Sequence, residues 1–129
     1  MPPLSLQRLK DTTVHELIEH FDEILAPYAI GANVTPDERM AIANRTIAEM
    51  PDIYAWANTV HTYFDWLTDR EAQLENMKSP LYKEARQRRD AAERIASVCK
   101  MKYQAASRLV TIRMHEDEEK DMPRTRSPR

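Results

Sequence analysis

Apolar side chains recur every three or four positions along most of this chain, which is the spacing of amphipathic α-helices. A first helix is predicted to begin at Thr13, where Glu16 follows as in a capping box, and to end before Pro27. Residues 1–11 precede it as a short arm whose leucines we expect to dock on the core or on a neighbouring chain. The apolar face of this helix consists of Val14, Leu17, Ile18, Phe21, Ile24 and Leu25.

Two further helices are predicted after a loop, with Pro51 between them. Thr35 is the expected N-cap of the second helix, because Pro36 follows at the first helical position and acidic residues come next. Pro51 would either end that helix or open the next one, since proline has no backbone N–H to donate. We favour a break there, with a third helix from Asp52 to about Met77.

The longest predicted element is one basic helix from Ser79 to His115. Ser79 is its expected N-cap with Pro80 at the first helical position, and neither glycine nor proline interrupts it before Pro123. A helix of about 35 residues is about 50 Å long, so we expect part of its apolar stripe to pack against another chain. That stripe contains Ala91, Ile95, Val98, Ala105, Leu109 and Ile112, with Ala92, Cys99 and Ala106 beside it.

These elements predict an all-α fold: a small bundle of about four helices with a long C-terminal helical hairpin. A single domain would span residues 1–115, with two short helices in 13–50 and the hairpin in 52–115. Residues 116–129 are too charged to bury apolar surface and are predicted to be a disordered tail. The chain's single glycine argues against β-hairpins and phosphate-binding loops, which depend on that residue.

The net charge of −2 conceals an uneven distribution. Residues 1–78 carry six basic and thirteen acidic residues, a net charge of −7, whereas residues 79–113 carry nine basic and three acidic residues, a net charge of +6. Residues 114–129 have a net charge of −1. Two interpretations stay open: the basic helix binds a polyanion, or the acidic helices neutralise it within the fold or between subunits.

No arrangement of residues indicates catalysis or metal binding. His15 and His20 are five positions apart, about 140° around a helix, whereas a zincin helix needs histidines four apart. The single cysteine, Cys99, excludes an internal disulfide, suits the apolar stripe and fits a reducing compartment. We therefore expect no enzymatic activity, no metal or other cofactor, no membrane span and a cytoplasmic location (that of the host cell, for a phage protein).

The basic helix is the candidate nucleic-acid interface. A row of cations gains affinity for phosphates by releasing counterions, without reading sequence. Tyr54 and Trp66 lie off the apolar stripe of the third helix, and we take Tyr63 and Trp66 as candidates for base stacking or subunit assembly. The predicted phosphate contacts are Lys83, Arg86, Arg88, Arg89, Lys100, Lys102, Arg108 and Arg113.

The aromatic segment 63–67 precedes an alternating-charge helix, which ends in the runs 106–109 and 111–113. In these features the C-terminal half of the chain resembles the phage recombination mediators typified by UvsY. The resemblance implies a small helical protein that assembles into a ring, binds single-stranded DNA, helps displace single-strand-binding protein and loads a RecA-like recombinase. Of that family's basic C-terminal segment, only Arg108 and Arg113 have counterparts here, and the acidic N-terminal half and tail depart from its pattern.

Two hypotheses about function follow. The first is a non-enzymatic, homo-oligomeric protein of phage type that binds single-stranded DNA and a protein partner, such as a recombinase, in recombination or replication. The alternative is a protein-interaction module, such as a phage inhibitor of a host machine or a virion component. Its binding surface would be the acidic face formed by Glu16, Glu19, Asp22 and Glu23.

Overall fold

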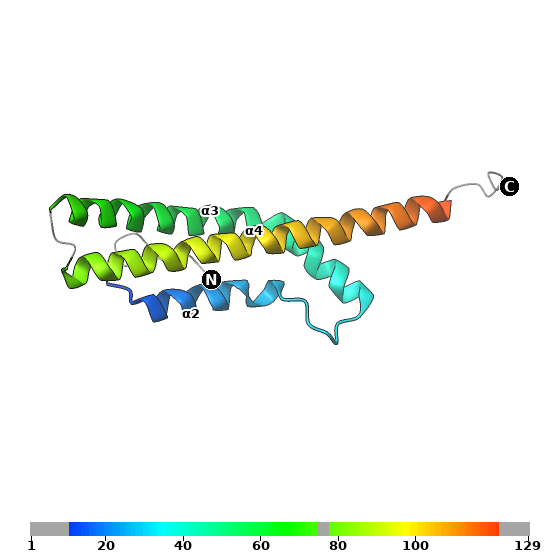
Figure 1. The fold of residues 1–129 in the computed structure, drawn as a ribbon. Coiled ribbons are helices and arrows are strands. Elements are labelled where there is room, and N and C mark those ends of the chain that lie inside the picture. Colours follow the sequence, from blue (N-terminus) through cyan, green and yellow to red (C-terminus); the bar gives the residue numbers. More distant parts are fainter. Residues whose placement is uncertain (1–10, 75–77, 122–129) are drawn as a thin grey trace.

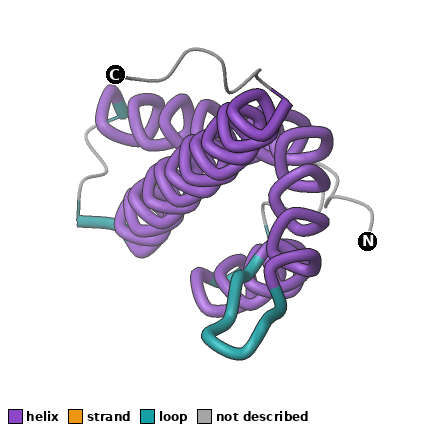
Figure 2. Tube along the Cα trace, turned by 90° about the vertical axis from the view of Figure 1, so that its right-hand side faces the viewer, coloured by secondary structure: helices purple, strands orange, loops and turns teal. Residues whose placement is uncertain are grey.

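The computed structural model describes residues 11–74 and 78–121, and within these ranges it contains three α-helices and no strand. The helices are α2 (Val14–Leu25), α3 (Pro36–Gln73) and α4 (Pro80–Asp121), and a short 3₁₀ helix, η1 (Ala26–Tyr28), follows α2 (Figure 1). Among the described residues, the non-helical segments are residues 11–13, the connection between α2 and α3, and the residues next to the turn between α3 and α4 (Figure 2). The predicted all-α class is confirmed, but the number of helices is three in these ranges rather than about four.

Three of the four predicted helix starts are confirmed by a side chain that accepts a hydrogen bond from an otherwise unpaired backbone N–H. Thr13 Oγ1 accepts from the N–H of Glu16 at 3.1 Å. At Thr35 the capping box is complete, since its hydroxyl accepts from the N–H of Glu38 at 3.1 Å and the Glu38 carboxylate accepts from the N–H of Thr35 at 3.4 Å. Ser79 Oγ accepts from the N–H of Tyr82 at 3.1 Å.

The predicted break at Pro51 is wrong, because α3 continues through it and joins the second and third predicted helices. A proline inside a helix typically costs about 3 kcal/mol and bends the axis. The first turns of α3 accordingly run at an angle to the remainder (Figure 1). Met50 and Ala57 are fully buried on either side of the proline, and this burial holds both parts in one helix. The hairpin therefore begins at Pro36 rather than at residue 52.

Helices α3 and α4 meet along a seam that repeats every seven residues. Ala43, Met50, Ala57 and Phe64 are buried in α3. Four small residues at the same spacing are buried in α4: Ala85, Ala92, Cys99 and Ala106. A seven-residue repeat keeps one face of each helix against its neighbour, and small side chains let the two backbones approach closely. The chain reverses between the two helices, which therefore form an antiparallel hairpin (Figure 1).

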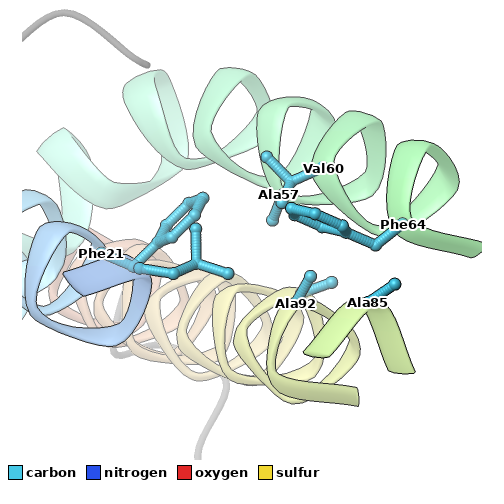
Figure 3. Close-up of a cluster of buried hydrophobic side chains, with 8 residues drawn as sticks. Phe21, Ala57, Val60, Phe64, Ala85 and Ala92 are labelled. Atoms are coloured by element: carbon cyan, nitrogen blue, oxygen red, sulfur yellow. The ribbon is translucent and has the colours of Figure 1, made fainter. Parts of the chain in front are cut away.

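Helix α2 covers part of this hairpin. Leu17 and Phe21 are each 1% exposed and pack with Val60 and Phe64 of α3 and with Ala92 of α4. Figure 3 shows Phe21 from α2 directed at the space between the two longer helices. The three helices thus share one core, which lies toward the end of the hairpin where α3 and α4 are connected.

The predicted apolar stripe of α4 is buried only in part. Ala91 is buried and Ile95 packs against the core, but the face against α3 is displaced by one position. Ala92, Cys99 and Ala106, predicted to lie beside the stripe, form the contact with α3. Val98, Ala105 and Ile112, predicted to lie within it, are exposed. The reason is steric, since the closest approach between two helices favours alanine and cysteine over the larger valine and isoleucine.

Helix α4 extends to Asp121, so the first six residues of the predicted disordered tail are helical. The C-terminal part of α4 projects past the other helices (Figure 1). Residues 122–129 of the predicted tail and residues 1–10 of the predicted arm lie outside the described residues.

Candidate nucleic-acid interface

Four of the predicted phosphate-binding residues form an exposed basic row on α4. Lys83, Arg86, Lys100 and Arg108 are exposed, and none of them forms a side-chain hydrogen bond or an ion pair with the residues that the structure describes. At 100° per residue, Lys83, Arg86 and Arg108 lie at least about 120° around the α4 axis from Ala92, which faces α3, and Lys100 lies about 80° from it. These four side chains are therefore free to meet an external anion, and we call them the basic row.

Two further candidates have carboxylate partners. Arg89 Nη2 lies 3.2 Å from Asp90 Oδ1, and its Nη1 lies 3.8 Å from Asp65 Oδ1 of α3. Arg113 Nε lies 3.6 Å from Asp117 Oδ1, one turn along α4. Within the described ranges, the Arg89–Asp65 pair is the one ion pair that joins α4 to another helix. In the described ranges, the acidic helices therefore neutralise one arginine of the basic helix.

Arg88 does not fit its predicted role, because its side chain is part of the core. The residue is 5% exposed, and its guanidinium carbon lies 5.7 Å from the centre of the Phe64 ring. Its Nη2 lies 3.6 Å from Glu84 Oε2, while its Nε has no hydrogen-bond partner. A phosphate cannot reach this group without displacing the packing around Phe64, so the structure removes Arg88 from the site.

Lys102 is half-buried and borders the core at Cys99. Burial raises the pKa of the Cys99 thiol, and the positive charge of Lys102 partly offsets that effect. A thiol whose pKa is raised by burial stays protonated at neutral pH and is a poor nucleophile. Cys99 therefore acts as a small apolar residue of the seam, as predicted.

The two candidate stacking residues are neighbours on α3. Trp66 is 52% exposed, with the Arg70 guanidinium 5.5 Å from the ring centre, and the Tyr63 and Trp66 rings are 6.1 Å apart. Together with Asn58, Thr59 and Thr62 they line a shallow hollow. Tyr63 is half-buried and its hydroxyl has no hydrogen-bond partner. Burial raises its pKa, Arg88 opposes the increase and Asp11 adds to it.

The structure does not bring the basic row and Trp66 together. Trp66 follows the buried Phe64 by two residues, which places it about 200° around the α3 axis, facing away from α4. Lys83, Arg86 and Arg108 face away from α3, whereas Lys100 lies at the edge of the helix contact and lines a hollow with Met50, Pro51 and Tyr54 of α3. One short nucleic-acid strand lying along the basic row would therefore not stack on Trp66 of the same molecule.

The acidic face predicted on α2 is also exposed. Glu16, Glu19, Asp22 and Glu23 are all accessible, and Glu19 is 2.9 Å from His15 Nε2. Among the described residues, no group of histidine, cysteine and carboxylate side chains is arranged to hold a metal ion.

Sequence reasoning missed the burial of Arg88, although a signal for it was present. Arg88 follows Ala85 by three positions in the repeat that continues at Ala92 and Cys99. Ala85 and Arg88 therefore occupy the two core positions of a heptad, and this register places Arg88 inside the seam.

Comparison of the chain with protein-family models, curated proteins and solved structures finds no match. No helix in the described part of the chain has an apolar stretch sufficient to span a membrane.

Proposed function

We propose that this protein binds single-stranded DNA through the basic row of α4, as a non-enzymatic helical protein that acts in recombination or replication with a protein partner such as a recombinase. The segment 63–67 and the basic C-terminal helix, which resemble phage recombination mediators, support the choice of single strands. Homo-oligomerisation belongs to the same proposal, because a longer array of cations would follow a longer strand.

The observation that carries the proposal is the exposure of Lys83, Arg86, Lys100 and Arg108 without carboxylate partners in the described ranges. Unpaired cations attract a polyanion and release its counterions on contact, whereas paired cations must first give up their carboxylates. From Lys83 to Arg108 the basic row spans 26 residues of a continuous helix, and the 25 steps between its ends correspond to about 38 Å at 1.5 Å per residue. Because this helix is already formed, it presents its charges without having to fold on binding.

Fluorescence anisotropy with a labelled single-stranded oligonucleotide tests the proposal. We expect binding at about 50 mM salt that weakens steeply as the salt concentration rises. A variant with Lys83, Arg86, Lys100 and Arg108 all changed to Gln should lose most of its affinity. The slope of log K against log salt should become shallower by roughly 0.7 for each phosphate contact removed.

Arg39→Gln provides the matched control, because Arg39 is exposed near the start of α3 and its loss changes the net charge as Lys100→Gln does. We expect Lys100→Gln to weaken binding and Arg39→Gln to leave it nearly unchanged. Absence of binding at low salt, or equal effects of these two substitutions, would refute the proposal.

The second candidate is a protein-interaction module that binds through the acidic face of α2. Asp22 and Glu23 favour it, since both are exposed and form no ion pair with the described residues. A pull-down from host lysate with and without nuclease separates the two functions. A partner retained after nuclease treatment, and lost in an Asp22→Asn, Glu23→Gln double variant, would favour the interaction module.

A further inference from the structure

Five apolar residues form an exposed stripe along the outer side of α4. Val98 is 40% exposed, Met101 64% and Ile112 49%. Ala105 is also exposed and Leu109 is half-buried. At 100° per residue, all of them lie within about 40° of the direction of Ala105. This stripe differs from the seam with α3 and from the basic row, and no described residue of the chain covers it fully.

The stripe is symmetric about Ala105 in chemistry as well as in spacing. Met101 and Leu109 lie four positions to either side of Ala105, and Val98 and Ile112 lie seven positions to either side. Eleven positions away, the stripe ends in Arg94 on one side and Glu116 on the other. Both charged residues are exposed, and neither forms an ion pair with the described residues.

We propose that this stripe is the contact surface for a second copy of the same chain, with two α4 helices crossing antiparallel about a two-fold axis at Ala105. A two-fold axis pairs each position with the one equally far on the other side of Ala105. Val98 then meets Ile112 of the second copy, Met101 meets Leu109, and Arg94 meets Glu116. Every apolar position gains an apolar partner, and each end gains an ion pair of opposite charges. At the edge of the contact, about 60° from Ala105, Lys102 faces Arg108 of the second copy.

The size of the central residue supports this partner. Ala105 lies where the two helices would be closest, and a small side chain there permits close contact between backbones. The spacing of the apolar residues is that of any amphipathic helix, but opposite charges at equal distances from an alanine favour a second copy of the chain, which pairs them. Self-complementarity accounts for all of these features together.

A groove between α2 and α4 continues the stripe toward the N-terminal part of α4. Val14, Ile18 and Leu25 from α2 and Ala91, Ile95 and Val98 from α4 are among its lining residues. Its volume is about 430 Å³, and the charged residues Asp22, Asp90 and Arg94 also line it. In the proposed arrangement, the projecting end of the second copy's α4 enters this groove with its Ile112 and Glu116. The projecting C-terminal part of α4 in one molecule is thereby covered by α2 and α4 of the other.

Light scattering of the full chain, without nucleic acid, tests the proposal. We expect the mass of a dimer or of a larger assembly built from dimers. Ala105→Glu places two like charges together on the two-fold axis and should convert the protein to the monomer. Gln104→Glu is the matched control, because Gln104 is exposed next to Ala105 but lies on another face. Circular dichroism should show that both variants stay helical.

A charge exchange tests the register of the pairing. Arg94→Glu and Glu116→Arg should each weaken the dimer by opposing like charges, and the double variant should restore it. Ala105→Cys should form a disulfide between copies under mild oxidation, whereas Gln104→Cys should form much less.

A monomeric wild-type protein would overturn the proposal, as would a dimer that Ala105→Glu and Gln104→Glu affect equally or a double variant that restores nothing. Because these measurements contain no nucleic acid and leave the basic row intact, they can fail without affecting the proposed DNA binding, and the reverse also holds.

Discussion

The hydroxyl of Tyr28 donates a hydrogen bond to the carboxylate of Glu49, which ties the 3₁₀ helix after α2 to the first part of α3. Arg45 completes this contact, with its Nε 3.0 Å from Glu49 Oε1 and its guanidinium carbon 5.6 Å from the centre of the Tyr28 ring. Tyr28 is buried. The contact lies on the bent part of α3 that precedes Pro51 and holds it against the rest of the bundle.

We predict that Tyr28→Phe destabilises the protein at neutral pH and that the effect disappears in acid. The hydrogen bonds from Tyr28 and Arg45 lower the pKa of the Glu49 carboxyl below its ordinary value of 4.5. The stability that the ionised Glu49 carboxylate contributes is therefore present above pH 4.5 and is lost as the pH falls through its lowered pKa. Burial, followed by the bond to Glu49, raises the pKa of Tyr28 above 10, so the tyrosine's contribution is lost only as the pH rises beyond that value.

Thermal unfolding of the wild type and Tyr28→Phe between pH 3 and pH 9 measures this difference. Tyr103→Phe serves as control, because the Tyr103 hydroxyl forms no hydrogen bond with the described residues. A Tyr28→Phe effect that stays the same size while the Glu49 carboxyl is protonated, as followed by NMR, would show that the bond to an ionised Glu49 is not its cause.

Ala92→Leu should lower the free energy of unfolding by about 1–3 kcal/mol, because the larger side chain cannot fit between α3 and α4 without moving them apart. Ala92 is 0% exposed in the seam. Ala55→Leu makes the same chemical change at an exposed position of α3 and should have an effect within about 0.5 kcal/mol. Urea titration followed by circular dichroism gives both values. Equal values would contradict the close approach of the helices at Ala92.

Arg88→Met should leave the free energy of unfolding unchanged or raise it by up to about 4 kcal/mol, since methionine keeps the packing on Phe64 without a buried charge. The affinity for an oligonucleotide should not change, because Arg88 is buried. Arg86→Met, on the basic row two residues away, should lower that affinity without a comparable effect on stability. The pair of variants separates a structural arginine from a binding one, and the reverse pattern would show that Arg88 is accessible in solution.

Trp66→Ala should leave the affinity for a short oligonucleotide unchanged, because Trp66 faces away from α4, the helix that carries the basic row. A base stacked on an aromatic side chain is worth about 1–3 kcal/mol, so a stacking Trp66 would cost at least about fivefold in affinity. In a Trp56→Phe background, the remaining fluorescence reports on Trp66 and should not respond to the oligonucleotide. Quenching together with a large loss of affinity would place the strand on α3 instead.

The helix starts could be predicted because their causes are local. Thr13, Thr35 and Ser79 each satisfy a backbone N–H three residues away, and that requirement is visible in the sequence. The continuation of α3 through Pro51 could not be predicted in this way. It depends on the burial of Met50 and Ala57 against the rest of the bundle, and these contacts are distant in sequence.

The candidate site could be predicted in part for the same reason. The concentration of positive charge on one helix is a property of the sequence, and four of its residues are exposed as required. The face of α4 that packs on α3 was ambiguous, because two neighbouring lines of residues, one through Ala91 and one through Ala92, are both apolar. Close packing of α3 and α4 favours the line with the smaller side chains. With that line against α3, Arg88 is buried and Val98 is exposed.

The seven-residue repeat of α4 has a consequence for the length of a bound strand. Lys100 follows Arg86 by fourteen residues, two full repeats, so both keep the same angular position relative to the seam. Their backbone positions are about 21 Å apart along the helix. A single strand must span this separation to contact both side chains. Under the proposed function, affinity should therefore increase with oligonucleotide length until one strand reaches both Arg86 and Lys100.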